Sequence, residues 1–222
     1  NMNDSKKASS NFAESRLLSL DFFRGFTMFL LIAEGTYLFE HMVDPSLQGT
    51  LIYSLGQQLH HHPWNGLRFW DLVQPFFMFI VGVAIPFSVA KRMQRGDNFS
   101  QILRHTVMRS LVLLFLGVML HSVGNGEITL RFQNVLAQLS VTYLIATLLM
   151  RRSVSTQLIV SVSLIVLSDL IYRFFPVAGY NFPFVADKNF GAYIDMFLSG
   201  ELSTGHWVSF NAIPTTAHTM WG

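Results

Sequence analysis

Residues 71–90 read DLVQPFFMFIVGVAIPFSVA, and the only ionisable side chain among them is Asp71 at the start. Because an α-helix needs about 20 mostly apolar residues to cross a bilayer, this stretch predicts a transmembrane helix. Four further stretches pass the same test: Leu17–Phe39, Thr106–Val123, Asn134–Met150 and Ser155–Phe175. A sixth begins near Trp207 and continues to the end of the sequence. We therefore expect an all-α, polytopic transmembrane helix bundle with five complete helices and the start of a sixth.

The composition supports a membrane protein and excludes several other classes. Hydrophobic residues make up 51% of the 222 residues and charged residues only 13%, too few to cover a compact core with a charged surface. Disorder, a coiled coil and an ordinary cytosolic enzyme are therefore excluded. The net charge of +2 gives no support for nucleic-acid binding. The absence of cysteine excludes disulfides, a thiol nucleophile and a cysteine-ligated metal.

The distribution of cations predicts the topology, because cytoplasmic connections are enriched in Lys and Arg. Cations gather in the N-terminal tail and in the second and fourth connections: Lys6, Lys7 and Arg16; Lys91, Arg92, Arg95 and Arg104; Arg151 and Arg152. The other connections contain few: Arg68, Arg131 and Lys188. We expect residues 1–15 to be a disordered cytoplasmic tail. The loops Glu40–Trp70 and Pro176–His206 then face outward.

Ionisable residues inside predicted spans are costly and are functional candidates by default. Asp21 and Arg24 lie three residues apart and share one helical face, so they form a structural ion pair or Arg24 meets an anionic cofactor. Glu34 lines a polar cavity or is protonated. Asp169 and Arg173, four residues apart, are expected to be a pair whose charged ends extend toward the interface.

Residues 60–67, HHHPWNGL, form the most unusual stretch and lead into Asp71. Three successive histidines on a loop are a poor tridentate metal site. They are either a solvated run, or one imidazole acts as a proton acceptor or nucleophile. In the second case Trp64 offers a flat face for a sugar and Asn65 an amide to orient a substrate. Asp71 could then hold the second nitrogen of the imidazole.

These residues resemble the heparan-α-glucosaminide N-acetyltransferase family, and in particular its bacterial NagX-like membrane branch. Residues 19–25, SLDFFRG, resemble the S-L-D-x-x-R-G motif that opens the family. Residues 61–67, HHPWNGL, resemble its H-x-x-W-[NH]-G segment, and residues 71–82 resemble the D-L-V-x-P-x-F-x-F-I-x-G run that follows. Weaker matches follow in the same order: Val135-Leu136, Val141-Thr142-Tyr143, Gly191-Ala192-Tyr193-Ile194-Asp195 and Ala212-Ile213-Pro214.

The resemblance implies a membrane acyltransferase that takes acetyl-CoA from the cytoplasm and acetylates an amino sugar or related glycan on the outer face. Family members have about eleven helices, so residues 16–222 are expected to be the N-terminal part of a longer transmembrane acyltransferase domain. A homodimer and a bacterial inner membrane are also implied, and no metal is. An inner-membrane sugar transporter and an inactive membrane scaffold remain as alternatives.

Residue roles follow from the match of motifs. The family's catalytic histidine corresponds to His61, with His60 and His62 as alternatives if the register differs by one. Whether it acts as nucleophile or general base stays open. The remaining assignments are Asn65 and Asp71 in catalysis, Trp64, His60, His62 and Glu34 in substrate binding, and Arg24 and Asp21 in binding acetyl-CoA.

Three positions depart from the family pattern. Gly35 stands where Asn is common, Gln138 replaces the Arg of a V-L-Q-R segment, and Gln74 stands where an aromatic residue is usual. The departures raise the prospect of a different acyl donor or acceptor.

Overall fold

The computed structural model describes residues 18–64, 66–125, 132–202 and 208–222, in which every regular element is a helix. Five helices are long: α2 (Leu18–Gly35), α5 (Val73–Gln94), α6 (Phe99–Asn125), α7 (Val135–Leu149) and α8 (Val154–Phe174). Four are short: α3 (Leu38–Met42), α4 (Leu51–Gln58), α9 (Phe190–Ser199) and α10 (Ala212–Trp221). Three are 3₁₀ turns: η1 (Pro45–Leu47), η2 (Phe69–Leu72) and η3 (Ser209–Asn211). The predicted all-α bundle is confirmed.

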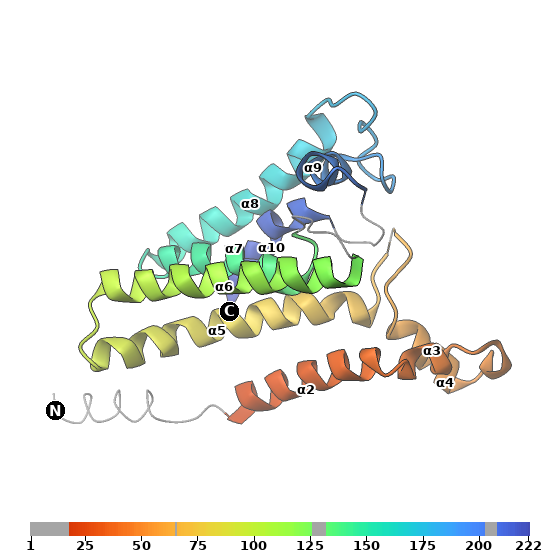
Figure 1. Cartoon of the computed structure of the whole chain (residues 1–222), viewed down its shortest axis with the longest axis horizontal. Helices are drawn as coiled ribbons and strands as arrows, with labels where there is room; N and C mark the ends of the chain where they lie inside the picture. Colours follow the sequence, from red (N-terminus) through yellow and green to blue (C-terminus); the bar gives the residue numbers. More distant parts are fainter. Residues whose placement is uncertain (1–17, 65, 126–131, 203–207) are drawn as a thin grey trace.

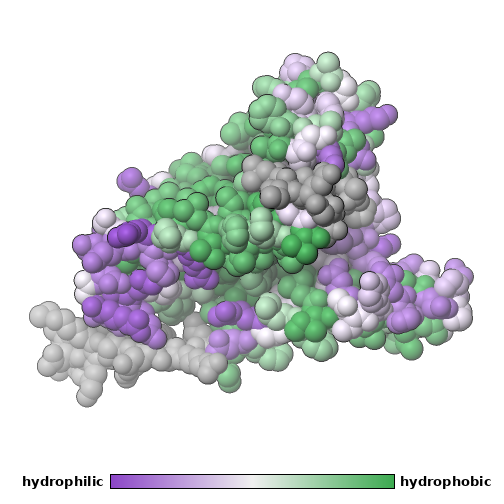
Figure 2. Space-filling model, viewed as in Figure 1, coloured by the Kyte–Doolittle hydropathy of each residue, from purple (hydrophilic) through white to green (hydrophobic). Residues whose placement is uncertain are grey.

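Three helical segments of the described chain are long and apolar enough to cross a membrane: Phe69–Gln94, Phe99–Leu120 and Val154–Phe174. Helix α7 is apolar but shorter, and α2 contains Asp21, Arg24 and Glu34. Figure 2 shows hydrophobic side chains over the middle of this face, while hydrophilic ones gather near the α5–α6 turn and around α3 and α4. This banding is what a lipid-embedded bundle requires.

The centre of the bundle is a core formed by α5, α6, α7 and α10. Met78 and Ile102 are almost fully buried there, with Leu139 and Tyr143 of α7 against them. Two glycines permit close helix approach. A side chain at Gly117 would collide with the start of α7, and one at Gly82 would collide with the backbone of α10. Small residues at such crossings are typical of membrane helices.

Helix α2 lies along one edge of the bundle and packs on α5 (Figure 1). The rings of Phe23 and Phe76 meet with centroids 5.5 Å apart. At the other end of α2, Leu30 and Ala33 join a second core with Phe39, Trp70 and Val73. This second core fixes the start of α5, and with it Asp71, against α2.

The predicted helix Leu17–Phe39 is wrong at its C-terminal end, and Leu17 lies outside the described residues. Helix α2 ends at Gly35, where the Thr36 hydroxyl donates to the Ala33 carbonyl at 2.7 Å. Tyr37 then adopts a left-handed conformation with φ of 60°, which starts the separate helix α3. The chain continues from the end of α2 into α3 and α4, which pack on each other (Figure 1).

Other boundaries differ for local reasons. Helix α6 begins seven residues before the predicted Thr106, because Asn98 and Gln101 cap its start by exchanging side-chain to backbone bonds of 2.8 and 2.9 Å. Helix α5 continues past the predicted Ala90. Helices α7 and α8 fall within a residue of the predicted ranges. The two long loops contain α3, α4 and α9, which the search for long apolar stretches missed. The sixth stretch contains α10, although Trp207 is not described.

Candidate functional site

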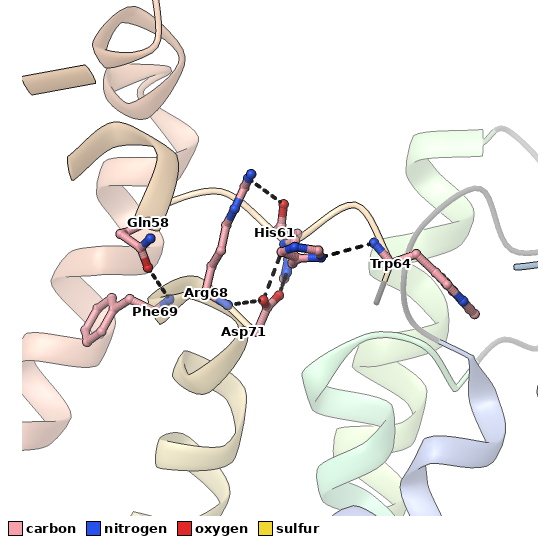
Figure 3. A network of polar contacts seen from close by, with 7 residues as sticks. Gln58, His61, Trp64, Arg68, Phe69 and Asp71 are labelled. Atoms are coloured by element: carbon pink, nitrogen blue, oxygen red, sulfur yellow. Dashed lines mark hydrogen bonds and ion pairs between the residues drawn. The ribbon is translucent and has the colours of Figure 1, made fainter. Parts of the chain in front are cut away.

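The His61 imidazole and the Asp71 carboxylate form a tight pair at the end of α5 (Figure 3). His61 Nδ1 lies 2.7 Å from Asp71 Oδ1. The second carboxylate oxygen accepts from the backbone N–H of Arg68 at 2.8 Å and of His62 at 3.3 Å. The Arg68 guanidinium donates to the His61 carbonyl at 3.1 Å. These bonds fix the loop and orient the carboxylate, so the tautomer with a proton on Nδ1 is favoured and Nε2 is the basic nitrogen.

The three successive histidines point to different places, as their position on a loop predicted. His60 Nδ1 bonds to the Gly56 carbonyl at 2.8 Å, and its Nε2 lies 3.8 Å from the Glu40 carboxylate. His60 therefore faces α3 and α4 and belongs to the scaffold of the loop. The imidazole of His62 packs against Gly66, where any side chain would collide with the ring. Only His61 pairs with Asp71 through its ring.

Trp64 links the loop that contains His61 to the loop that contains Phe184, at the same end of the bundle. Its indole Nε1 donates to the Phe184 carbonyl at 2.7 Å, and its backbone N–H lies 3.4 Å from His62 Nδ1. The two partners of the indole bond are 120 residues apart in sequence. Phe184 in turn lies under Arg173, whose guanidinium carbon is 4.9 Å from the ring centroid. Arg173 is bonded to Asp169 at 2.7 Å, so the predicted Asp169–Arg173 pair is confirmed.

One cavity, here called the Trp64 cavity, opens between these two loops and has a volume of about 400 Å³. Its lining combines aromatic rings with hydrogen-bonding groups. The rings are Trp64, Tyr172 and Phe184, and the polar groups are His62, Asp71, Asp169, Asn189 and Asn211. Flat apolar faces beside carboxylates and amides are the combination that hydroxylated rings require.

A second cavity, the His61 cavity, lies on the other side of the His61–Asp71 pair and has a volume of about 520 Å³. Its walls are mostly apolar, with a few polar groups at one end. The apolar walls are Met28, Leu31, Trp70, Val73, Phe77, Leu120, Val135 and Leu136; the polar groups are Glu34, His61, Gln74, Gln133 and Asn134. Glu34 lines a cavity, as one of its two alternatives predicted, but the walls of that cavity are mostly apolar rather than polar.

Two of the three departures from the family pattern contact each other beside this cavity, which Gln74 lines. Gln74 Nε2 donates to Gln138 Oε1 at 2.6 Å. Gln138 is fully buried, and Gln74 exposes 7% of its surface. The pair connects α5 to α7 across 64 residues of sequence, and the Gln74 side chain also lines the cavity. The two substitutions therefore compensate each other in one respect, since the Gln74 nitrogen and the Gln138 oxygen satisfy each other.

A third cavity, the Arg24 cavity, lies further along the bundle and has a volume of about 390 Å³. Arg24 of α2 and Arg109 of α6 both line it, and Ser88 and Tyr143 add hydroxyl groups. The Arg109 guanidinium lies over the Tyr143 ring at 4.8 Å from the centroid. Phe77 and Leu136 line both this cavity and the His61 cavity, so the two are neighbours. Arg109 was not predicted as a site residue, because no local sequence pattern pairs it with Arg24.

Two further predicted site residues are Asn65 and Asp21. Asn65 lies outside the described residues, so its role stays a prediction. Asp21, grouped with Arg24 for cofactor binding, is not among the residues that line the Arg24 cavity. Among the described residues, no group of three or more His, Cys, Asp or Glu side chains could hold a metal ion.

A family described as a domain of unknown function, DUF5009, matches residues 16–199. The chain belongs to this family. It is also 29% identical over 153 residues to the heparan-alpha-glucosaminide N-acetyltransferase of Mus musculus, covering 66% of this chain and 20% of that protein. The enzyme of the same name from Homo sapiens is 30% identical over 141 residues, covering 60% and 19%.

The family relationship predicted from the motifs is therefore confirmed. The chain spans about a fifth of the length of these curated relatives. Together with its long apolar helices, the relationship supports an integral membrane protein.

Proposed function

We propose that this DUF5009 member moves an acetyl group from cytoplasmic acetyl-CoA to an amino sugar on the outer face of the membrane. One observation carries the proposal. The His61–Asp71 pair lies between a cavity suited to a hydroxylated ring and a mostly apolar cavity that adjoins two arginines. That order of chemistries is what a transfer between a long anionic donor and a sugar acceptor requires.

The donor would enter from the end of the bundle that contains the α5–α6 turn. Arg24 and Arg109 would bind its phosphates, because guanidinium groups form charge-assisted bonds to phosphate. The uncharged arm would pass Phe77 and Leu136 and bring the thioester to His61. The cations that gather at Lys91–Arg104, at this same end of the bundle, support its assignment to the cytoplasm.

The acceptor would bind in the Trp64 cavity. A pyranose ring has apolar faces that stack on an indole, and its hydroxyl groups bond to carboxylates and amides. The bond from the indole to the Phe184 carbonyl holds the ring of Trp64 in place before the sugar arrives, which lowers the entropic cost of binding.

In the transfer, the lone pair of the sugar's neutral amine attacks the thioester carbonyl carbon, and the carbonyl π electrons move onto oxygen. The carbonyl then re-forms, and the C–S bond breaks with its electron pair leaving on sulfur. His61 Nε2 takes the proton that the nitrogen loses and returns it to the thiolate. The products are an amide and the free thiol of CoA. Asp71 stabilises the imidazolium that forms between these steps.

His61 could instead attack the thioester itself and hold the acetyl group as an acyl-imidazole. Labelled acetyl-CoA without acceptor, followed by a rapid acid quench, separates the two routes. Label on His61 in less than one turnover time supports the nucleophile, and its absence supports the general base.

The test of the proposed function uses the intact purified protein in detergent, with acetyl-CoA and glucosamine as substrates. Mass spectrometry should detect N-acetylglucosamine with the wild type and not with His61→Asn. No acetylated sugar with either protein, over a series of amino-sugar acceptors, would overturn the proposal.

A transporter is the second candidate, and the adjacency of the His61 and Arg24 cavities favours it. Neighbouring cavities that contain Glu34 and two arginines could form a path for a sugar or a proton. Radiolabelled sugar that crosses sealed vesicles unmodified would support this candidate.

A further inference from the structure

We infer that the His61 cavity recognises a secondary amide, one oxygen and one N–H, by means of Gln74 and Gln133. The inference deepens the proposed function and rests on it in one respect, namely that the amide belongs to the uncharged arm of the acyl donor. Neither glutamine was assigned a role on sequence grounds beyond the departure at Gln74.

The orientation of the Gln74 side chain is fixed by its partner. Its Nε2 donates to Gln138 Oε1 at 2.6 Å, so this nitrogen faces α7. The oxygen Oε1 accepts no hydrogen bond from any protein group in the part of the chain that the structure describes. Because Gln74 lines the His61 cavity, the group left for a ligand is a hydrogen-bond acceptor. A ligand N–H satisfies it.

Gln133 supplies the complementary donor. Its Nε2 is buried and has no hydrogen-bond partner among the described residues, and its side chain lines the same cavity. A buried N–H without a partner costs about as much as a lost hydrogen bond, so such a group points to a ligand. The terminal torsion of glutamine is broad, so a small rotation turns Nε2 toward the cavity. A ligand carbonyl oxygen satisfies it.

One acceptor and one donor in an otherwise mostly apolar cavity are the complement of a secondary amide. Free carboxylates and phosphates do not fit, since Gln74 Oε1 would repel them and Glu34 adds negative charge to the lining. The apolar walls suit a thin uncharged chain better than a ring with many hydroxyl groups. Gln74, in the first turn of α5, follows Asp71 of η2 by three residues and lines the same cavity as His61, so an amide bound there lies near the His61–Asp71 pair.

Two sources could supply such an amide: the pantetheine arm of the donor and the N-acetyl group of the product. The cavity favours the arm because Phe77 and Leu136 connect it with the two arginines rather than with Trp64. The two sources differ in what a probe must contain, so binding measurements separate them.

The experiment compares two small probes whose only difference is N–H against O. N-acetylcysteamine S-acetyl thioester contains the amide, and 2-(acetylthio)ethyl acetate contains an ester in its place. Dissociation constants are measured by calorimetry on the intact wild-type protein, independently of turnover. We expect the amide probe to bind about 10-fold more tightly, as one hydrogen bond to a buried acceptor implies. Equal binding of the two probes would overturn the inference.

Variants locate the effect. Gln74→Leu should bind the amide and ester probes about equally, a ratio of about 1. Gln133→Met should weaken the binding of both probes, since each probe contains a carbonyl oxygen at this position. Gln48→Leu, at an exposed position of the outer loop, is the matched control and should keep the 10-fold preference. If Gln74→Leu fails to fold because Gln138 loses its partner, Gln74→Leu/Gln138→Leu removes both amides together. A preference that persists in that double variant would also overturn the inference.

The outcomes separate this inference from the proposed function. Acetyl transfer without an amide preference overturns the inference and leaves the function standing. An amide preference without acetyl transfer leaves the recognition standing and overturns the function. Finally, N-acetylglucosamine that competes with the amide probe, when glucosamine does not, would assign the amide to the product and overturn the assignment to the donor arm.

Discussion

The His61 cavity and the Trp64 cavity adjoin the His61–Asp71 pair, since His61 lines the first and Asp71 the second, but their linings differ in chemistry. The first has aliphatic and aromatic walls with amides and one carboxylate, and the second has aromatic rings with carboxylates, amides and an imidazole. Two consecutive residues face different cavities, since His61 lines the His61 cavity and His62 lines the Trp64 cavity. Under the proposed function one loop would contact both ligands, so substitutions on the two sides should separate donor effects from acceptor effects.

The largest effect is expected for His61, which both ligands need. His61→Asn removes the basic nitrogen and should lower kcat by about 1,000-fold, within the range for general acid–base catalysis. The rate of acetyl transfer measures it, and the far-ultraviolet circular dichroism and melting temperature should match the wild type. The same substitution at His60, which faces α3 and α4, is the control and should cost less than 10-fold. Full activity of His61→Asn would contradict a catalytic role for His61.

Asp71→Asn should have the next largest effect, a loss of about 100-fold in kcat with little change in either KM. The amide cannot stabilise the imidazolium and no longer favours the proton on Nδ1 of His61. Steady-state kinetics with each substrate varied in turn provide the measurement. If KM for the acceptor alone rose and kcat were unchanged, Asp71 would act by binding the acceptor in the Trp64 cavity and not through His61.

On the donor side, Arg24→Ala and Arg109→Ala should each raise KM for acetyl-CoA by about 10-fold and leave KM for the sugar unchanged. The effect should shrink in high salt, because phosphate contacts are screened. Arg95→Ala, an exposed cation at the end of α5, is the matched control. Equal changes for Arg24, Arg109 and Arg95 would indicate a general surface-charge effect and would contradict a donor site.

On the acceptor side, Trp64→Phe should have the smallest effect, about a 5-fold rise in KM for the sugar alone. The ring is kept, but the bond to the Phe184 carbonyl is lost, so the aromatic face is less well positioned. Trp64→Leu should raise it further, since it removes the ring as well. A change in KM for acetyl-CoA, with none for the sugar, would exchange the assignments of the two cavities.

Much of the site could be predicted because its residues are close in sequence. The separation of ten positions from His61 to Asp71, the position of Glu34 in a span and the pairing of Asp169 with Arg173 are all local patterns. The fold was predictable where apolar stretches were long. It was not predictable at Tyr37, where a left-handed residue ends one helix and starts another.

What sequence reasoning missed depends on distant contacts. The Gln74–Gln138 pair joins residues 64 apart, and the Trp64–Phe184 bond joins residues 120 apart. Arg109 and Arg24 meet at one cavity from two different helices. No periodicity or spacing encodes such pairs, since tertiary packing alone brings the helices together. The departures at Gln74 and Gln138 were visible in the sequence, but their mutual compensation was visible only in space.

The most direct test of the account is the sidedness of the two substrates in sealed vesicles that contain the intact protein in one orientation. Labelled acetyl-CoA is supplied on the side of the α5–α6 turn, which contains Lys91 and Arg92, and glucosamine on the side of the His61 loop. The account predicts labelled N-acetylglucosamine on the His61 side only, and none when the two substrates are exchanged. Equal product in both arrangements, or product on the α5–α6 side, would contradict transfer between the two cavities.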